Sequence, residues 1–200
     1  GLWIQWLIEH NAAPVDAISK RIFWLFFLAA VPAYFLSALW LPMPGWLYTL
    51  VVAAAFAQLA GFILLLLHLR KSSIIILNTL SKPVKWLWAL ALIALTIKLL
   101  LQLGSTIPSL NMVAYGFRPI VIGYLHLVLL GVFSIFLAGY FIAITNIPYS
   151  AILKNGLIVF VAGIMINELL LMLQGVDAML YQPIPVMNYL LFAAAIIMCS

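Results

Sequence analysis

Charged side chains are scarce in this chain, and their scarcity decides the class of protein before any motif is considered. Nine Lys and Arg residues and four Asp and Glu residues make up 6% of the 200 positions, while 68% of the positions are hydrophobic. A soluble domain carries roughly 25% charged residues, because its whole surface must be hydrated. The composition therefore excludes a soluble globular domain and predicts a protein whose main partner is a lipid bilayer.

Thiols and the common enzyme signatures are also missing. Cys199 is the single cysteine, which excludes an internal disulfide and a thiolate metal cluster. No Walker loop, GxSxG elbow, CxxC or HExxH occurs, and no basic stripe interleaved with aromatics indicates a nucleic-acid partner. The chain begins with Gly1 and ends inside the apolar run LLFAAAIIMCS. We therefore expect a piece of a longer polytopic protein, whose partners are the rest of that chain or other membrane subunits.

Apolar stretches of membrane-spanning length follow one another along the whole chain. About 20 apolar residues cross the ~30 Å hydrocarbon core as a helix, and no stretch alternates with the period of two that a strand requires. The sequence therefore predicts an all-α polytopic transmembrane helical bundle over residues 1–200, as a single domain within a larger bundle. Its six expected spans are 20–41, 46–69, 84–104, 117–145, 151–175 and 184–200.

The basic residues divide unequally between the two sides of such a bundle. Seven of the nine lie at the start of the first span, or in and beside the loops after the second and fourth spans: Lys20, Arg21, Arg70, Lys71, Lys82, Lys85 and Lys154. The alternate loops hold only Arg118. Because cytoplasmic loops carry the excess of Lys and Arg, we expect the start of the chain to be cytoplasmic in a bacterial inner membrane.

Ionisable residues inside the predicted spans are candidates for function, because charge is costly in hydrocarbon. Lys98 and Glu168 lie roughly 10 Å below the outer ends of their spans at 1.5 Å per residue, so they are at equal depth. Gln102 follows Lys98 by one helical turn, and Arg118 begins the fourth span. Together these four residues predict an outer-side polar cluster for transport or a proton relay. In the alternative interpretation, Lys98 extends outward along its stem while Glu168 has a structural role.

A histidine lies near the centre of the fourth predicted span. His126 is about 13 Å deep, and Gly123 precedes it by one turn on the same face. Imidazole ligates metals, and a glycine beside it lets a flat haem macrocycle approach. The sequence therefore makes His126 a candidate haem-iron ligand with Gly123 in the binding surface. An interhelical hydrogen bond is the alternative. His68 is separated from His126 by something like 14 Å in depth, too far for both to ligate one iron.

The segment around His126 carries a family resemblance. RPIVIGYLHLVLLGVFSIFLAGYF, with GYLHLVLLG as its core and KLLLQLGSTIP upstream, resembles a family of bacterial multi-pass membrane proteins of uncharacterised function. That family is distantly similar to subunit I of the haem-copper oxidases and nitric oxide reductases. The stretch FWLFFLAAVPAYFLSALWL is a weaker match. The resemblance implies that His126 is a haem or metal ligand in respiratory electron transfer, although the paired histidines of that superfamily are absent from this sequence.

Three functions are therefore expected for the chain. The first is a haem-binding membrane protein with an oxidase-subunit-I-like scaffold, linked to respiratory electron transfer. The second is a transporter or channel-like protein that uses Lys98, Glu168 and Arg118. The third is a non-catalytic structural or assembly subunit whose polar groups hold helices together.

Overall fold

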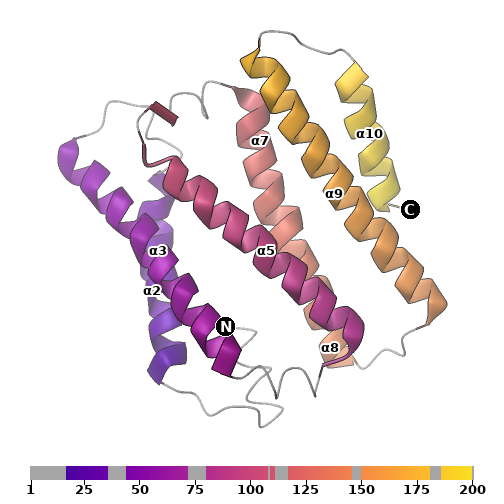
Figure 1. The fold of residues 1–200 in the computed structure, drawn as a ribbon, viewed down its shortest axis with the longest axis horizontal. Helices are drawn as coiled ribbons and strands as arrows, with labels where there is room; N and C mark the ends of the chain where they lie inside the picture. Colours follow the sequence, from indigo (N-terminus) through magenta and orange to yellow (C-terminus); the bar gives the residue numbers. More distant parts are fainter. Residues whose placement is uncertain are drawn as a thin grey trace. The chain divides into compact units, whose positions relative to one another are not determined.

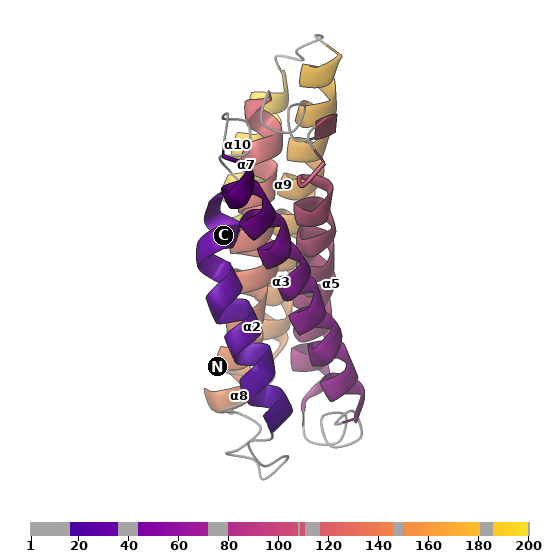
Figure 2. The ribbon, with the colours of Figure 1, turned by 90° about the vertical axis from the view of Figure 1, so that its left-hand side faces the viewer.

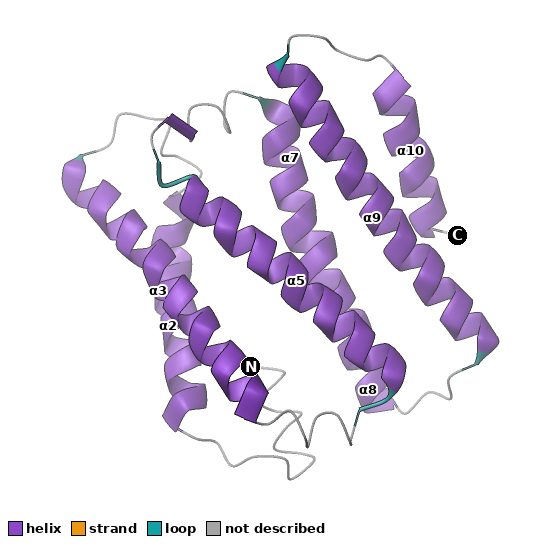
Figure 3. Cartoon of the chain, in the orientation of Figure 1, coloured by secondary structure: helices purple, strands orange, loops and turns teal. Residues whose placement is uncertain are grey.

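The structure is a computed structural model, and it describes residues 17–35, 44–71, 80–107, 109–110, 117–145, 150–180 and 186–199. Within these ranges every regular element is a helix and no strand occurs (Figure 3). An apolar chain in hydrocarbon must satisfy its backbone hydrogen bonds internally, and helices do so within a single segment. The prediction of an all-α bundle is confirmed.

The helices follow the predicted spans closely, since proline-containing connections separate the apolar runs. Their bounds are α2 (Ala17–Tyr34), α3 (Gly45–Lys71), α5 (Lys82–Gly104), α7 (Arg118–His126), η2 (Leu127–Ser134), α8 (Ile135–Thr145), α9 (Ala151–Met179) and α10 (Val186–Cys199). Segments α7, η2 and α8 succeed one another without a break, and η2 is a π-helix. Ser150 caps α9, because its hydroxyl oxygen accepts a hydrogen bond from the Leu153 N–H at 3.2 Å.

Four of these helices are long and apolar enough to cross a membrane among the described residues. They comprise Gly45–Arg70, Lys82–Gly104, Arg118–Thr145 and Ala151–Met179. Helix α2 has 18 residues with Pro32 inside it, and α10 has 14 residues. Both are shorter than the roughly 20 residues that a full crossing requires. The expected count of about six spans was therefore slightly generous, while membrane insertion itself is supported.

The chain divides into two compact units. Residues 1–80 and 99–111 form the first unit, and residues 81–98 and 112–200 form the second. In the first unit, α2 packs along α3, as Figure 2 shows. The packing is close at Gly61, where an added Cβ would lie 3.2 Å from the Phe26 ring. Tyr48 of α3 donates a hydrogen bond to the carbonyl of Thr106 at 2.8 Å, which ties the end of α5 to this unit.

In the second unit, α9 packs against α7 on one side and α10 on the other (Figure 1). The amide nitrogen of Gln174 in α9 donates to the side-chain oxygen of Asn188 in α10 at 3.0 Å. The first part of α5 packs against α8. There Trp88 stacks on Phe136 with ring centroids 5.8 Å apart, and its indole N–H donates to the Phe136 carbonyl at 3.3 Å. Gly139 of α8 lets the Trp88 ring lie this close to α8.

Gly139 of α8 faces the Trp88 indole so closely that any larger residue would force the ring or the helix to move. An added Cβ would lie 2.8 Å from two atoms of the indole ring. Gly139→Ala should therefore lower the free energy of unfolding by about 1–3 kcal/mol, the usual cost of overpacking. Thermal unfolding of the purified protein in detergent, followed by circular dichroism, measures the change.

Gly156→Ala is the matched control, because nothing lies within 4 Å of the position that its Cβ would take. Alanine is preferred over glycine in a helix by about 1 kcal/mol, so this variant should be neutral or slightly more stable. Equal shifts for the two variants would contradict the described packing of α5 against α8.

Candidate functional site

The contacts between α7 and α9 fix the relative heights of their residues. An added Cβ on Gly175 would lie 3.1 Å from Ile120, and one on Gly123 would lie 3.6 Å from the Cβ of Leu171. From Ile120 to Gly123 the chain advances three residues along α7, while the matching contacts on α9 go back four residues, from Gly175 to Leu171. The two helices are therefore antiparallel. One more step of the same size places His126 at the height of Asn167.

Helix α5 meets the same level from another direction. An added Cβ on Gly131 of η2 would lie 3.3 Å from Ala94, and Gly139 of α8 lies against Trp88, so α5 runs antiparallel to this helix. Lys98 follows Ala94 by one turn. One turn back from Gly131 is Leu127, the first residue of η2. Lys98 therefore lies at about the height of His126.

Four polar residues consequently lie at one height in the second unit, and we call them the polar layer: Lys98, His126, Asn167 and Glu168. Three different helices supply them, namely α5, α7 and α9. The equal depth expected for Lys98 and Glu168 agrees with this register. Whether the two side chains form an ion pair stays a prediction.

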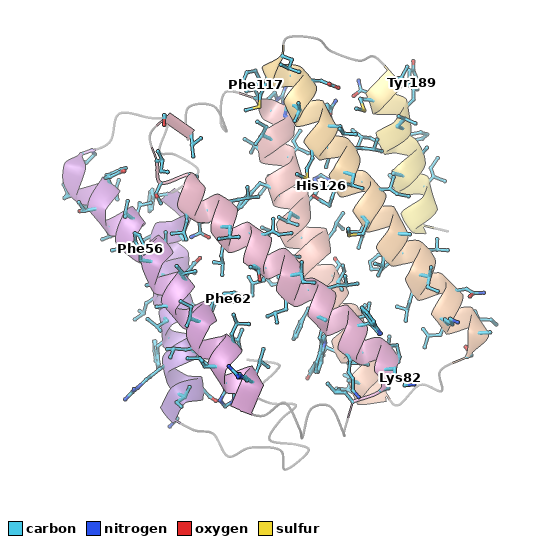
Figure 4. All side chains as sticks on the ribbon, in the orientation of Figure 1. Phe56, Phe62, Lys82, Phe117, His126 and Tyr189 are labelled. Atoms are coloured by element: carbon cyan, nitrogen blue, oxygen red, sulfur yellow. The ribbon has the colours of Figure 1, made fainter. Side chains whose placement is uncertain are left out.

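His126 is the last residue of α7, is half-buried, and lies on the side of that helix next to α9 (Figure 4). Its Nδ1 lies 2.9 Å from the carbonyl oxygen of Ile122, one turn earlier in the same helix. A carbonyl only accepts hydrogen bonds, so Nδ1 must carry the proton in the neutral ring. Nε2 then has a free lone pair. This is the form in which a histidine accepts a proton or binds a metal ion.

Asn167 and Glu168 place two enclosed polar atoms on α9. Asn167 is 5% exposed and Glu168 is half-buried. The amide nitrogen Nδ2 of Asn167 and the carboxyl oxygen Oε1 of Glu168 are buried without a hydrogen-bond partner among the described residues. A buried polar atom left unsatisfied costs about 1–3 kcal/mol. Neighbouring polar atoms of this kind in an apolar bundle indicate a functional site more than a stabilising one.

Both α9 residues lie near the side of the helix that packs against α7. Asn167 precedes Leu171 by one turn, and Glu168 precedes Gly175 by two turns, so each shares a face with a residue that contacts α7. Asn167, Leu171 and Gly175 are buried along this face. The layer is therefore turned toward the interior of the second unit.

The helix changes its winding directly after His126. Residues Leu127–Ser134 form a π-helix, in which the turns are wider than in an α-helix. The hydroxyl of Ser134 donates to the carbonyl of Leu129, five residues earlier, at 2.9 Å. π-helical segments are rare, usually last a single turn, and occur frequently at functional sites. This segment, in contact with the polar layer, is a second indication that function is located here.

The predicted haem surface beside Gly123 is filled by protein. Leu171 of α9 lies in van der Waals contact with the position of the missing side chain. The glycine thus admits a neighbouring helix where a macrocycle was expected, and the residues present do not fit a haem beside Gly123. Nε2 of His126 stays available in this packing, so ligation of a metal by His126 remains a prediction. In the described part of the chain, no group of three or more His, Cys, Asp or Glu side chains is arranged to hold a metal ion.

Of the other members of the predicted polar cluster, Arg118 lies apart from the layer. Arg118 is exposed at the start of α7, two residues before Ile120, and therefore lies near the height of Asp177. Asp177 is nine residues, or roughly 14 Å, beyond Glu168 along α9. Gln102 is buried in the first unit, at 3% exposure. His68 is also buried in that unit, at 7% exposure.

Sequence reasoning missed Asn167 and the π-helix. Asn167 carries no charge, so a search for ionisable residues in apolar runs passes over it, although it stands next to Glu168 in MINELLL. The π-helical sequence LVLLGVFS is apolar on all sides, and its periodicity contains no signal of wider winding. Comparisons of the chain with protein families, with curated proteins and with solved structures find no match.

The hydrogen bond between His126 and Ile122 predicts the tautomer of the ring. In the neutral ring, Nδ1 should be protonated and Nε2 unprotonated, because the Ile122 carbonyl can only accept a hydrogen bond. Solid-state NMR of protein labelled with 15N in its histidine rings distinguishes the two nitrogens, and spectra of His126→Ala assign the signal. A protonated Nε2 with a bare Nδ1 would contradict the described geometry.

Proposed function

We propose that this protein moves an ion or a small polar solute across a bilayer, with the polar layer as its transfer site. The observation that carries the proposal is the pair of enclosed, unsatisfied atoms on α9, Asn167 Nδ2 and Glu168 Oε1, at the height of His126 and Lys98. A structural cluster would satisfy these atoms within the protein. A transfer site leaves hydrogen-bonding capacity for the species that passes through it.

The adjoining π-helix supports the same function. Transport requires a segment with two accessible arrangements, and π-helical segments within α-helices occur frequently at functional sites. Gly131, at the centre of η2, lies against Ala94 of α5, so a change in winding there alters how α5 meets α7. A change in the winding of η2 would therefore shift residues of the polar layer.

Charge movement through reconstituted protein tests the proposal. Liposomes adsorbed to a solid-supported electrode should give a transient current when a gradient of the carried ion is applied. Glu168→Gln keeps the shape of the side chain but removes its charge, and we expect it to abolish that current. Lys154 is exposed near the start of α9, so Lys154→Gln should leave the current unchanged.

Gradients of H⁺, Na⁺, K⁺ and Cl⁻ should be applied in turn, with substrate mixtures of uncharged polar solutes tested by light scattering. The absence of any protein-dependent current or solute uptake would contradict transport. That result would favour a structural or assembly role instead.

We further propose that the membrane is the cytoplasmic membrane of a bacterium, with the basic helix ends on the inside. Lys20 and Arg21 lie near the start of α2, Arg70 at the end of α3, and Lys82 and Lys85 at the start of α5. The charge of these ends favours the cytoplasmic side.

Cysteine labelling in a Cys199→Ala background tests the orientation. An impermeant maleimide added to intact cells should label Gly45→Cys, because α3 begins on the outside, and should not label Ser81→Cys. Permeabilised cells, in which both variants should react, provide the control. Labelling of Ser81→Cys alone in intact cells would reverse the topology.

Haem binding linked to electron transfer is the second candidate function, and the availability of His126 Nε2 is the observation that favours it. If His126 ligates haem, protein purified from cells supplied with haem precursors should show a Soret band. His126→Ala should abolish that band, while His68→Ala should leave it intact. A Soret band that survives the loss of His126 would contradict the ligand role.

A further inference from the structure

The polar layer contains charges of both signs, and this limits what it can carry. Lys98 is a cation and Glu168 a carboxylate at the same height, with the imidazole of His126 beside them. Metal cations such as Na⁺, Ca²⁺ or Mg²⁺ are held by six or more oxygen ligands, and a lysine in the same layer repels them. A bare anion is repelled by Glu168 in the same way. Neither class of ion fits the layer well.

The burial of Asn167 limits the size of the species that can bind in the layer. With 5% of its surface exposed, its amide can be reached only by a very small molecule. The nitrogen Nδ2 is a donor that lacks an acceptor among the described residues, whereas Nε2 of His126 at the same height is left as an acceptor because Nδ1 donates to Ile122. A molecule between them must accept one hydrogen bond and donate another. Water meets both requirements and has the right size.

On these grounds we infer that the layer conducts protons, and that a water molecule held between Asn167 Nδ2 and His126 Nε2 joins Glu168 to His126 in the relay. The inference rests on the proposed transport function and deepens it by naming the carried species. It assigns a water-binding site to Asn167, which is a positioning residue because it never carries the proton itself.

The proton balance of the relay is simple. Protonated Glu168 donates its proton to the oxygen of the water, and that water donates a different proton to Nε2 of His126. The products are a carboxylate, a water molecule and an imidazolium whose Nδ1 proton stays bonded to the Ile122 carbonyl. The ring then turns, which breaks the bond between Nδ1 and the Ile122 carbonyl, and Nε2 releases its proton to water on the other side of the layer. Return of the neutral ring restores the bond to Ile122. One proton enters, one leaves, and no electron moves.

The groups that surround the relay agree with this assignment. Helix α10 runs antiparallel to α9 (Figure 1), and the hydrogen bond between Gln174 and Asn188 sets a register that brings Ala194 near the height of Asn167. Ala194 is 1% exposed and adds only a methyl group to this level. Among the described residues, the remaining ionisable group at this level is Lys98.

Proton flux into liposomes loaded with the pH-sensitive dye pyranine tests the inference. A potassium gradient with valinomycin supplies the driving voltage, and 22Na⁺ uptake is measured in parallel on the same preparation. We expect the wild-type protein to acidify the lumen without taking up 22Na⁺. Glu168→Gln and His126→Gln should reduce proton flux to the level of empty liposomes, because neither glutamine can hold the proton.

Asn167→Leu and Asn167→Ser separate the bridging water from a merely structural asparagine. Leucine fills the site and removes the donor, so proton flux should be lost. Serine keeps a donor and leaves room for water, so at least part of the flux should return. Asn188→Ala removes an interhelical hydrogen bond outside the layer and should leave proton flux unchanged. Circular dichroism confirms that each variant is folded, and the serine variant provides the test if the leucine variant is not.

The outcomes separate this inference from the proposed function. Uptake of 22Na⁺ that depends on Glu168, with proton flux at background, would overturn the inference and leave transport intact. Unchanged proton flux in Asn167→Leu would overturn the bridging water. Background flux of every ion in the wild-type protein would overturn both.

Discussion

Hydrocarbon offers no hydrogen bonds, and the structure depends on that constraint at two levels. The backbone must satisfy its N–H and C=O groups within each segment, which makes every described element a helix. The same solvent offers nothing to polar side chains, so those that occur in the spans turn toward other helices. Asn167 and Glu168 are buried or half-buried on the faces of α9 that meet α7. Their position follows from the solvent as directly as the helices do.

Small residues at the helix crossings fix the heights of the helices relative to one another. Helices without bulky side chains at a crossing approach closely, and van der Waals packing then replaces the hydrophobic effect as the force between them. Gly123 and Gly175 set the height of α9 against α7, while Gly131 and Gly139 set that of α5. The polar layer exists because these four contacts bring residues from three helices to one level. A shift of α9 by one turn would leave His126 facing Gly163 or Leu171 in place of Asn167.

Much of the fold could be predicted from the sequence, because apolar length and proline punctuation are local signals. The expected span 84–104 differs from α5 by two residues at its start, and 117–145 differs from α7–η2–α8 by one residue. The count of spans was harder, since a short apolar run such as α10 does not reveal whether it crosses. The end of α2 at Tyr34 was missed as well, because Pro32 lies within a run that stays apolar to residue 41.

The site was predictable in part. Lys98, His126 and Glu168 were found because an ionisable residue in an apolar run is conspicuous, and the equal depth of Lys98 and Glu168 followed from counting residues. Their partner Asn167 required the tertiary register, which no single sequence contains. Gly123 shows the limit most clearly. A glycine beside a histidine is equally suited to a macrocycle or to a neighbouring helix, and only the packing reveals Leu171 in that space.

Cross-linking measures the register most directly. In a Cys199→Ala background, cysteines at positions 126 and 167 should be joined efficiently by a short bismaleimide, as detected by mass spectrometry of the digested protein. Cysteines at 126 and 175 are eight residues further apart along α9, roughly 12 Å, and should be joined poorly. Preferential joining of 126 to 175 would contradict the polar layer, and with it the basis for a transfer site in this protein.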